Sequence, residues 1–163
     1  MAIFRGEDLE IYISKIKKRL LEHNYKLTPQ REATVKVLLE NNKKHLSAED
    51  TYFLVKKKVP EIGLATVYRT LELLTDLGLL YKLNFGDGVS RYEFNFDETK
   101  HNHHHLVCLN CGKVEEIFED MLGFIEDKIK RKYSFQIVDH HLVFNGFCSM
   151  CKGNEEKLSG EVS

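Results

Sequence analysis

The sequence predicts an α+β protein: an N-terminal winged helix-turn-helix, followed by a small α/β domain with structural zinc. Two observations support this prediction. Four helical patterns and then a β-hairpin occupy the first 96 residues, which is the order of elements in a winged helix. The remainder carries all four cysteines as two C-x-x-C pairs, which is ligand spacing typical of a structural zinc site.

Composition indicates a folded protein that does not span a membrane. Of 163 residues, 42% are hydrophobic and 30% are charged, a balance typical of globular chains. No apolar run approaches the roughly 20 residues that cross a bilayer, and the N-terminus lacks the features of a secretory signal. We therefore expect a cytoplasmic protein, in which paired cysteines bind metal rather than form disulfides.

Charge and histidine content differ between the two parts of the chain. Up to residue 96 there are 16 Lys and Arg against 13 Asp and Glu, whereas beyond it there are 8 against 12. An anionic partner would therefore meet the first part. Six of the eight histidines fall between residues 101 and 141, in the part that also holds the cysteines.

The predicted helices have clear boundary signals. Thr28 suits an N-cap, with Pro29 at the first helical position. Ser47 begins a capping box with Asp50, and Gly78 is a natural C-terminal stop. The four helical ranges are 7–24, 25–41, 46–60 and 63–78.

A β-hairpin is predicted after the fourth helix. Its strands, 79–85 and 91–96, are joined by the segment GDGVS. Asp-Gly suits a tight turn, and Tyr92, Phe94 and Phe96 alternate as a half-buried strand requires. This hairpin supplies the wing of the predicted unit.

The fourth helix is the candidate recognition helix, because the second helix of such a pair enters the major groove of DNA. Arg69 lies opposite the apolar Val67, with Thr66 and Tyr68 beside it. An Arg can bind a guanine edge, and a Tyr can contact a base methyl or a phosphate. Double-stranded DNA is thus the expected partner, although winged helices also serve as protein-interaction modules.

The two C-x-x-C pairs predict a tetrahedral zinc site. Each pair places two thiolates on a tight knuckle, and two knuckles complete the coordination of one zinc ion. Such a site contributes on the order of 10 kcal/mol to folding. A thioredoxin-like redox pair is the alternative, but it needs only one C-x-x-C and a βαβ context. Between the pairs, a helix over 119–133 and a strand over 135–147 are predicted.

The segment HNHHHLVC at 101–108 predicts a second metal site. In a strand, side chains alternate between faces. His101, His103 and His105 would then share one face, whereas His104 and Cys108 would share the other. The histidine site and the cysteine site are therefore separate.

Two carboxylates are candidate ligands for the second site. Glu93 lies opposite the aromatic face of its strand, and Glu116 shares a face with Val114, where a carboxylate without a cation would be costly. Imidazole with carboxylate suits Fe²⁺, Mn²⁺ or Zn²⁺. The alternative is that these acids are exposed and the histidines form a solvated cluster.

Several ordered motifs carry a resemblance to a known family. They are LTPQR, HLSAED, GLATVYRTLELL, FGDGVSRYEF, HHHLVCLNCGKVEEI and the closing C-x-x-C. Over about residues 9–152 the chain resembles the ferric uptake regulator family. The resemblance implies a homodimeric, metal-dependent transcriptional repressor. Its implied parts are a DNA-binding domain at 1–96, a hinge at about 96–101, a dimerisation domain at 101–152 and a polar tail at 153–163.

The resemblance also implies roles for individual residues, matched position by position. The structural zinc ligands would be Cys108, Cys111, Cys148 and Cys151. The ligands of the regulatory metal, expected to be Fe²⁺ with Mn²⁺ or Zn²⁺ as substitutes, would be His45, Glu93, His103, His105 and Glu116. The residues that contact operator DNA, an A/T-rich inverted repeat, would be Lys26, Arg31, Tyr68 and Arg69.

A third metal site of some family members is only partly matched. His104 and His140 occupy two of its positions, but its carboxylate would fall near Gly123 and a further ligand position holds Asn102. A substitute carboxylate would require a different local register. The candidates are Glu119, Asp120 and Glu126.

Alternatives remain open within the family and outside it. Peroxide-sensing members tend to have Asp where Glu116 stands, so Glu at positions 93 and 116 favours the iron-responsive branch. The zinc-uptake branch stays open, because His and Glu also bind zinc. From another class, a zinc-dependent hydrolase or deaminase would use His103 and His105 as ligands and Glu116 to activate water. Five candidate ligands favour a filled sensing site over the open position that catalysis needs, so we expect no enzyme. A purely structural zinc-stabilised interaction module would leave the histidines and carboxylates unused.

Overall fold

The computed structural model describes residues 6–95, 103–119, 121–138, 140 and 142–152. Contacts within the chain divide it into two compact units, residues 1–98 and 99–163, which we call unit 1 and unit 2. The predicted hinge and polar tail lie outside the described residues. Among the described residues, no helix combines the length and apolar composition that crossing a membrane requires.

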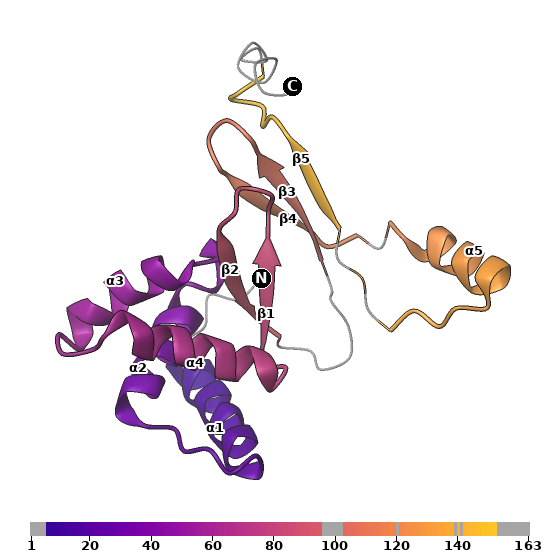
Figure 1. The fold of residues 1–163 in the computed structure, drawn as a ribbon. Coiled ribbons are helices and arrows are strands. Elements are labelled where there is room, and N and C mark those ends of the chain that lie inside the picture. The colour runs from indigo at the N-terminus through magenta and orange to yellow at the C-terminus, as the bar shows by residue number, and fades with distance from the viewer. Residues whose placement is uncertain (1–5, 96–102, 120, 139, 141, 153–163) are drawn as a thin grey trace. The chain divides into compact units, whose positions relative to one another are not determined.

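The described part of unit 1 has the predicted winged helix-turn-helix order (Figure 1). The short 3₁₀ helix η1 lies between its second and third α-helices. The elements are α1 Gly6–Glu22, α2 Pro29–Glu40, η1 Asn42–Lys44, α3 Ala48–Lys58, α4 Leu64–Asp76, β1 Leu80–Asn84 and β2 Ser90–Phe94.

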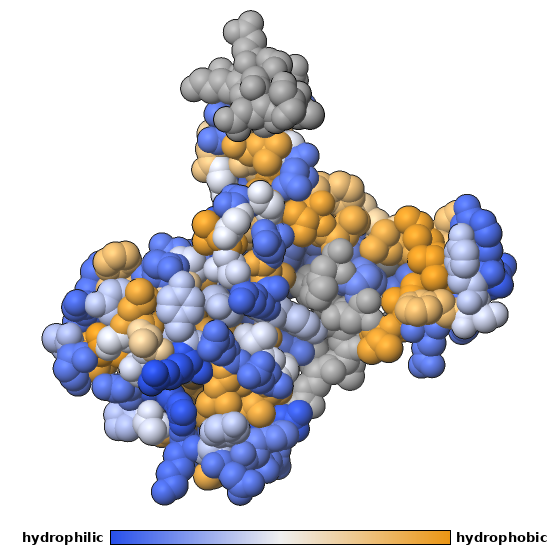
Figure 2. All heavy atoms as spheres, in the orientation of Figure 1, coloured by the Kyte–Doolittle hydropathy of each residue, from blue (hydrophilic) through white to orange (hydrophobic). Residues whose placement is uncertain are grey.

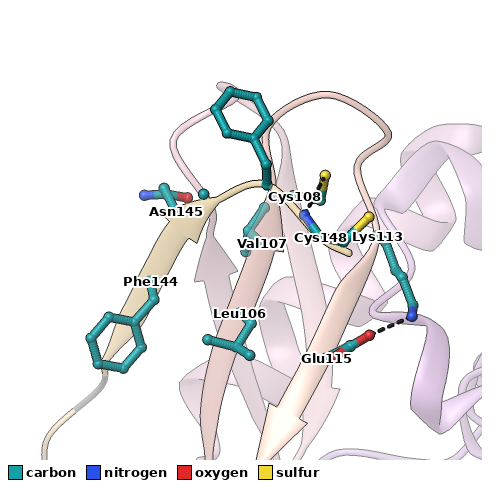
Figure 3. Close-up of a pocket in the computed structure, with 10 residues that line it drawn as sticks. Leu106, Val107, Cys108, Lys113, Glu115, Phe144, Asn145 and Cys148 are labelled. Carbon is teal, nitrogen blue, oxygen red and sulfur yellow. Dashed lines mark hydrogen bonds and ion pairs between the residues drawn. The ribbon is translucent and has the colours of Figure 1, made fainter. Parts of the chain in front are cut away.

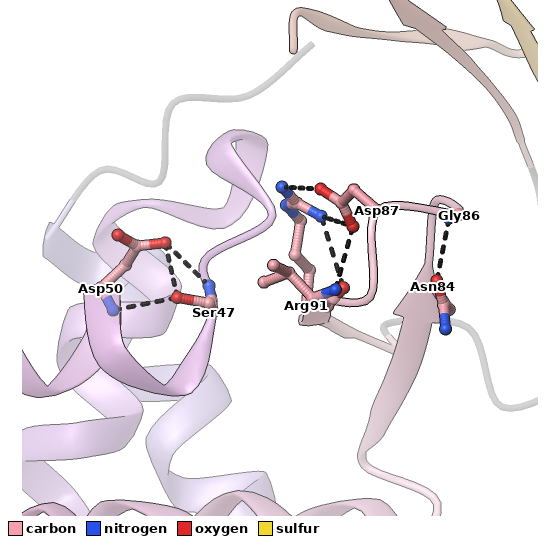
Figure 4. A network of polar contacts seen from close by, with 7 residues as sticks. Ser47, Asp50, Asn84, Gly86, Asp87 and Arg91 are labelled. Carbon is pink, nitrogen blue, oxygen red and sulfur yellow. Dashed lines mark hydrogen bonds and ion pairs between the residues drawn. The ribbon is translucent and has the colours of Figure 1, made fainter. Parts of the chain in front are cut away.

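The predicted caps of α2 and α3 are formed. Thr28 Oγ1 accepts a hydrogen bond from the backbone N–H of Arg31. At α3, Ser47 Oγ accepts from the N–H of Asp50 at 3.0 Å, and Asp50 Oδ2 accepts from the Ser47 N–H at 3.1 Å (Figure 4). The reciprocal pair satisfies two of the N–H groups that a helix start leaves without partners.

Ser47→Ala is expected to lower the free energy of unfolding of unit 1 by about 1 kcal/mol, because it removes the cap while Asp50 keeps its charge. The measurement is urea unfolding of the full chain, followed by the helical circular dichroism signal. Ser149→Ala, at an exposed position in unit 2, is the matched control. An unchanged midpoint for Ser47→Ala would show that the capping box does not stabilise the unit.

The core of unit 1 lies between its helices and the hairpin. Val67, Leu71 and Leu74 form an apolar stripe along α4 and are at most 1% exposed. They pack in one cluster with apolar residues of the other helices and with Leu80 of β1. Gly78 ends this helix region with φ of +70°, a conformation that costs glycine little.

The hairpin forms the wing. β1 and β2 pair antiparallel, with Tyr92 and Phe94 buried as predicted, whereas Phe96 lies outside the described residues. In the turn, Asp87 Oδ2 accepts from Arg91 Nη2 at 2.7 Å (Figure 4). The Arg91 guanidinium holds the pKa of Asp87 at about 2, so the pair persists at neutral pH. The backbone N–H of Tyr92 donates to the carbonyl of Leu46, which ties the wing to the start of α3.

Unit 2 is a small sheet with one described helix. The sheet order is β4-β3-β5; β3 pairs antiparallel with β4 and parallel with β5. The elements are β3 His104–Cys108, β4 Val114–Ile117, α5 Gly123–Tyr133 and β5 Val143–Gly146.

Two elements of unit 2 are shorter than predicted. The helix expected from residue 119 begins at Gly123, because the chain must first leave the end of β4 at Ile117. Among the described residues of the segment 135–147, where a strand was expected, only β5 is a strand. Strand structure there requires a partner, and β3 pairs with this segment only from Val143 to Gly146.

Unit 2 buries little apolar surface. Of its described apolar side chains, only Cys108 and Cys151 are buried, and α5 has no buried residue. Phe124 is 79% exposed and Val138 is 83% exposed. Figure 2 shows apolar residues gathered over the sheet and beside α5. A three-stranded sheet needs a buried face for stability, so unit 2 requires stabilisation beyond its own core.

Candidate metal centres and nucleic-acid interface

The four cysteines converge in unit 2. Cys108 ends β3, Cys111 follows in the turn, and Cys148 and Cys151 come directly after β5. Because β3 and β5 are parallel neighbours, the two knuckles emerge at the same edge of the sheet. The four thiols are free of disulfides, and their sulfur atoms all lie within 4.8 Å of one another.

The spacing and electrostatics of this cluster fit zinc. Cys111 Sγ and Cys148 Sγ are 3.8 Å apart, and thiolates about 2.3 Å from a tetrahedral zinc stand about 3.8 Å from each other. The backbone N–H of Cys148 donates to Cys108 Sγ at 3.4 Å. This donor and a backbone donor at Cys111 lower the pKa of Cys108 to about 6. Cys108 therefore favours the thiolate form, which is the form that binds metal, whereas the neighbouring thiols and burial raise the pKa of Cys151 to about 11.

A pocket of about 150 Å³ lies beside the knuckles (Figure 3). Leu106 and Phe144, which are paired across β3 and β5, supply apolar lining, and the ion pair of Lys113 with Glu115 stands at the same pocket. Both apolar side chains are more than one-third exposed. They alternate with His105 and Val143, so the pocket lies on the sheet face away from His105.

The histidine-bearing strand has the predicted alternation of faces. The rings of His103 and His105 lie 4.9 Å apart, and Glu116 stands directly opposite His105 in the register of β3 with β4. His104 points to the other face. His101 lies outside the described residues. Unit 2 thus brings together two imidazoles and one carboxylate, on the face opposite the one that Cys108 shares with His104.

Unit 1 brings together His45 and Glu93. The distance from His45 Nε2 to Glu93 Oε2 is 3.6 Å, and both residues are buried. His45 ends η1 with φ of 46° and ψ of 61°, a left-handed conformation that is costly for a residue with a side chain. Its ring packs edge-on against Phe85 of the wing, with centroids 5.8 Å apart. Strain at a buried polar residue is typical of a functional position.

Another histidine pair lies in unit 2. The rings of His104 and His140 are 5.4 Å apart, and Glu126 Oε1 lies 2.8 Å from His140 Nδ1. Position 123, where simple counting placed the carboxylate, is the glycine that begins α5. Glu126 follows one turn later on the same helix, which brings a carboxylate back toward the histidines.

The predicted DNA contacts lie in unit 1. Arg69 is exposed on α4, and Lys26 is exposed before α2. The guanidinium of Arg31 donates to the carbonyl of Lys26 at 2.8 Å, so the two basic residues are neighbours. Tyr68 is half-buried, and its hydroxyl donates to Glu49 Oε1 at 2.5 Å. Nothing in the sequence pattern predicted this last contact.

A sequence model of the Ferric uptake regulator family matches residues 22–145. This chain belongs to the ferric uptake regulator family. The Ferric uptake regulation protein of Bacillus subtilis (strain 168) is 60% identical over 147 residues, covering 90% of this chain and 99% of the relative. The Peroxide-responsive repressor PerR of Staphylococcus epidermidis is 31% identical over 145 residues, covering 89% and 91%.

A solved structure of a family member has the same fold. The Helicobacter pylori ferric uptake regulator Fur matches with a TM-score of 0.76 at 25% identity, over 93% of this chain and 97% of that one, and its structure revealed three functional metal-binding sites. The resemblance that the motifs indicated is thus confirmed, together with the α+β fold. The residue pattern alone predicted the cysteines, His103, His105 and both glutamates as metal ligands, whereas His45 was predicted only through the resemblance.

Proposed function

We propose that this protein is a metal-dependent transcriptional repressor, which binds operator DNA as a homodimer when a regulatory divalent metal, Fe²⁺, is bound. The proposal rests on one observation in this family member: the candidate ligands of the regulatory metal are divided between the two units. The winged-helix unit holds a buried imidazole–carboxylate pair, and unit 2 holds two imidazoles with a facing carboxylate.

The regulatory metal would be held by His45 and Glu93 of unit 1 and by His103, His105 and Glu116 of unit 2. Two carboxylates neutralise a divalent ion, and imidazole with carboxylate suits Fe²⁺, with Mn²⁺ or Zn²⁺ as substitutes. An ion held by ligands of both units would restrict their relative orientation. That restriction is what a switch needs, since a ligand shifts an equilibrium only by its differential affinity for the two states.

The divided ligand set implies a definite energetic requirement. To move the DNA-competent state from about 1% to 99% of the population, the metal must prefer that state by about 5.5 kcal/mol. In a dimer, two α4 helices would then enter major grooves about 34–36 Å apart, or at a multiple of that distance. Lys26, Arg31, Tyr68 and Arg69 would make the contacts, and the cations would bind phosphates or guanine edges.

Iron is favoured over the other metals by two features. The relative at 60% identity is named for ferric uptake regulation, and the ligand set has glutamate at both carboxylate positions. A peroxide-responsive role in the same family is the second candidate, supported by PerR at 31% identity, and a zinc-sensing role is the third, because imidazole and carboxylate also bind zinc. A repressor of transcription acts where the DNA is, which in a bacterial cell is the cytoplasm.

The four cysteines would hold structural zinc, and a second copy of the chain would cover unit 2. Bound zinc would compensate for the small apolar core near the knuckles, because the free energy of binding a structural metal contributes to the free energy of folding. The partly exposed apolar face of Leu106 and Phe144, and α5, which has no buried residue, suit a homodimer interface, where apolar surface is buried between identical partners.

His104, His140 and Glu126 would form an additional metal site. Two imidazoles and a carboxylate are a suitable donor set for a divalent transition metal. The three residues lie within unit 2, which is also the proposed dimerisation unit, so a metal there would stabilise α5 against the sheet. Glu126, which the sequence offered only as one of three substitutes, is the carboxylate that the structure brings to His140.

The test is fluorescence anisotropy on an A/T-rich inverted-repeat duplex, with free Fe²⁺, Mn²⁺ and Zn²⁺ buffered separately, anaerobically and at fixed salt. Protein already holding one zinc per chain should bind tightly only when Fe²⁺ or Mn²⁺ is added. A response to Zn²⁺ alone would move it to the zinc-sensing branch. Absence of metal-dependent binding, on this duplex and on selected random DNA, would contradict the repressor.

A further inference from the structure

An acidic residue stands in contact with the candidate recognition helix. Glu49, exposed in the first turn of α3, accepts a hydrogen bond from the Tyr68 hydroxyl of α4. A carboxylate at a DNA-binding surface repels phosphates, so it weakens the sequence-independent part of binding. A carboxylate beside a residue of the proposed interface should therefore have a function that offsets this loss of affinity.

The local structure around Glu49 fixes the position and the charge of its carboxylate. It follows the N-cap Ser47 by two residues, and the capping box with Asp50 fixes this turn. Negative charge is stabilised at a helix N-terminus. The hydrogen bond from Tyr68 is the largest cause that lowers the pKa of Glu49, and the same bond raises the pKa of Tyr68. At neutral pH the carboxylate is therefore ionised and the phenol keeps the proton that it donates.

We propose that Glu49 is a positioning residue that makes Tyr68 read bases rather than phosphates. The carboxylate occupies the only proton that the hydroxyl can donate, which prevents donation to a phosphate oxygen. It also fixes the ring against α3, which leaves the apolar ring face for contact with a base methyl. This inference rests on the proposed DNA-binding function, and it assigns Glu49 to specificity rather than to affinity.

The proposal predicts that Glu49→Ala changes the affinity for operator DNA and the affinity for a scrambled duplex differently. Glu49→Ala should bind a scrambled duplex more tightly, because a repulsive charge is removed, and this gain should shrink at higher salt. The same variant should lose about tenfold in the ratio of operator affinity to scrambled affinity, the range expected when a charge-assisted hydrogen bond is lost. Glu49→Gln, whose amide oxygen can still accept from Tyr68, should keep most of the ratio.

A double-mutant cycle separates positioning from charge. Glu49→Ala, Tyr68→Phe and the double variant are titrated as metal-saturated full-length dimers against both duplexes by anisotropy. If Glu49 acts through the Tyr68 hydroxyl, Glu49→Ala should lower the ratio in the wild-type background and leave it unchanged in the Y68F background. Glu10→Ala, at an exposed position of α1, makes the same charge change and should not alter the ratio.

The outcomes distinguish this inference from the proposed function. A wild-type protein that shows no preference for operator would contradict the repressor itself. If wild type discriminates but Glu49→Ala keeps the full ratio, or lowers it equally in both backgrounds, Glu49 does not position Tyr68. Circular dichroism of each variant confirms that α3 and α4 remain folded, so that a loss of structure is not taken for a loss of specificity.

Discussion

Cys111→Ser is expected to release the structural zinc and to unfold the sheet of unit 2. A structural zinc site contributes on the order of 10 kcal/mol, whereas whole domains are stable by about 5–15 kcal/mol. Unit 2 has almost no apolar core to offset the loss, since none of its described apolar side chains is buried except at two cysteines. The dimer should therefore dissociate, because its interface would be built on this unit.

The measurement combines zinc content per chain with sedimentation of the purified protein. Wild type should hold one tightly bound zinc in the cysteine site and sediment as a dimer, whereas Cys111→Ser should do neither. Ser149→Ala, placed between Cys148 and Cys151, should behave as wild type. A Cys111→Ser protein that remains dimeric with an intact sheet would show that metal binding by the cysteine cluster does not stabilise this unit.

His103→Ala is expected to abolish metal-dependent operator binding while zinc content and dimerisation remain unchanged. His103 lies on the sheet face away from Cys108, so its loss leaves the cysteine cluster intact. Removing one ligand of the regulatory metal weakens its preference for the DNA-competent state. If the full preference of about 5.5 kcal/mol is lost, operator affinity in the presence of metal falls by up to about 10⁴-fold.

Glu116→Ala and His45→Ala should behave in the same way, because they remove ligands of the same ion from different elements. Anisotropy titrations with buffered Fe²⁺ or Mn²⁺ measure the effect. His23→Ala, at an exposed position after α1, is the matched histidine control and should keep the full metal response. Variants at His103 and Glu116 that still require metal for operator binding would show that the regulatory ligands lie elsewhere.

Local sequence rules were sufficient to predict the order of the α-helices and the wing of unit 1. The caps at Thr28 and Ser47, the alternation of Tyr92 and Phe94 and the Asp-Gly turn of the wing act over a few residues, where side-chain spacing and backbone preference decide the structure. The alternation of His103 and His105 against His104 was predictable for the same reason. These features came from the sequence alone and are confirmed in the fold.

The tertiary structure decided which distant residues meet. The cysteine knuckles share an edge because β3 and β5 are parallel, and sequence spacing does not specify strand partners. Glu126 reaches His140 because α5 begins at Gly123, four residues later than periodicity suggested. The contact of Tyr68 with Glu49 joins two helices across 19 positions. Such contacts depend on packing between elements, and no local preference of either residue encodes them.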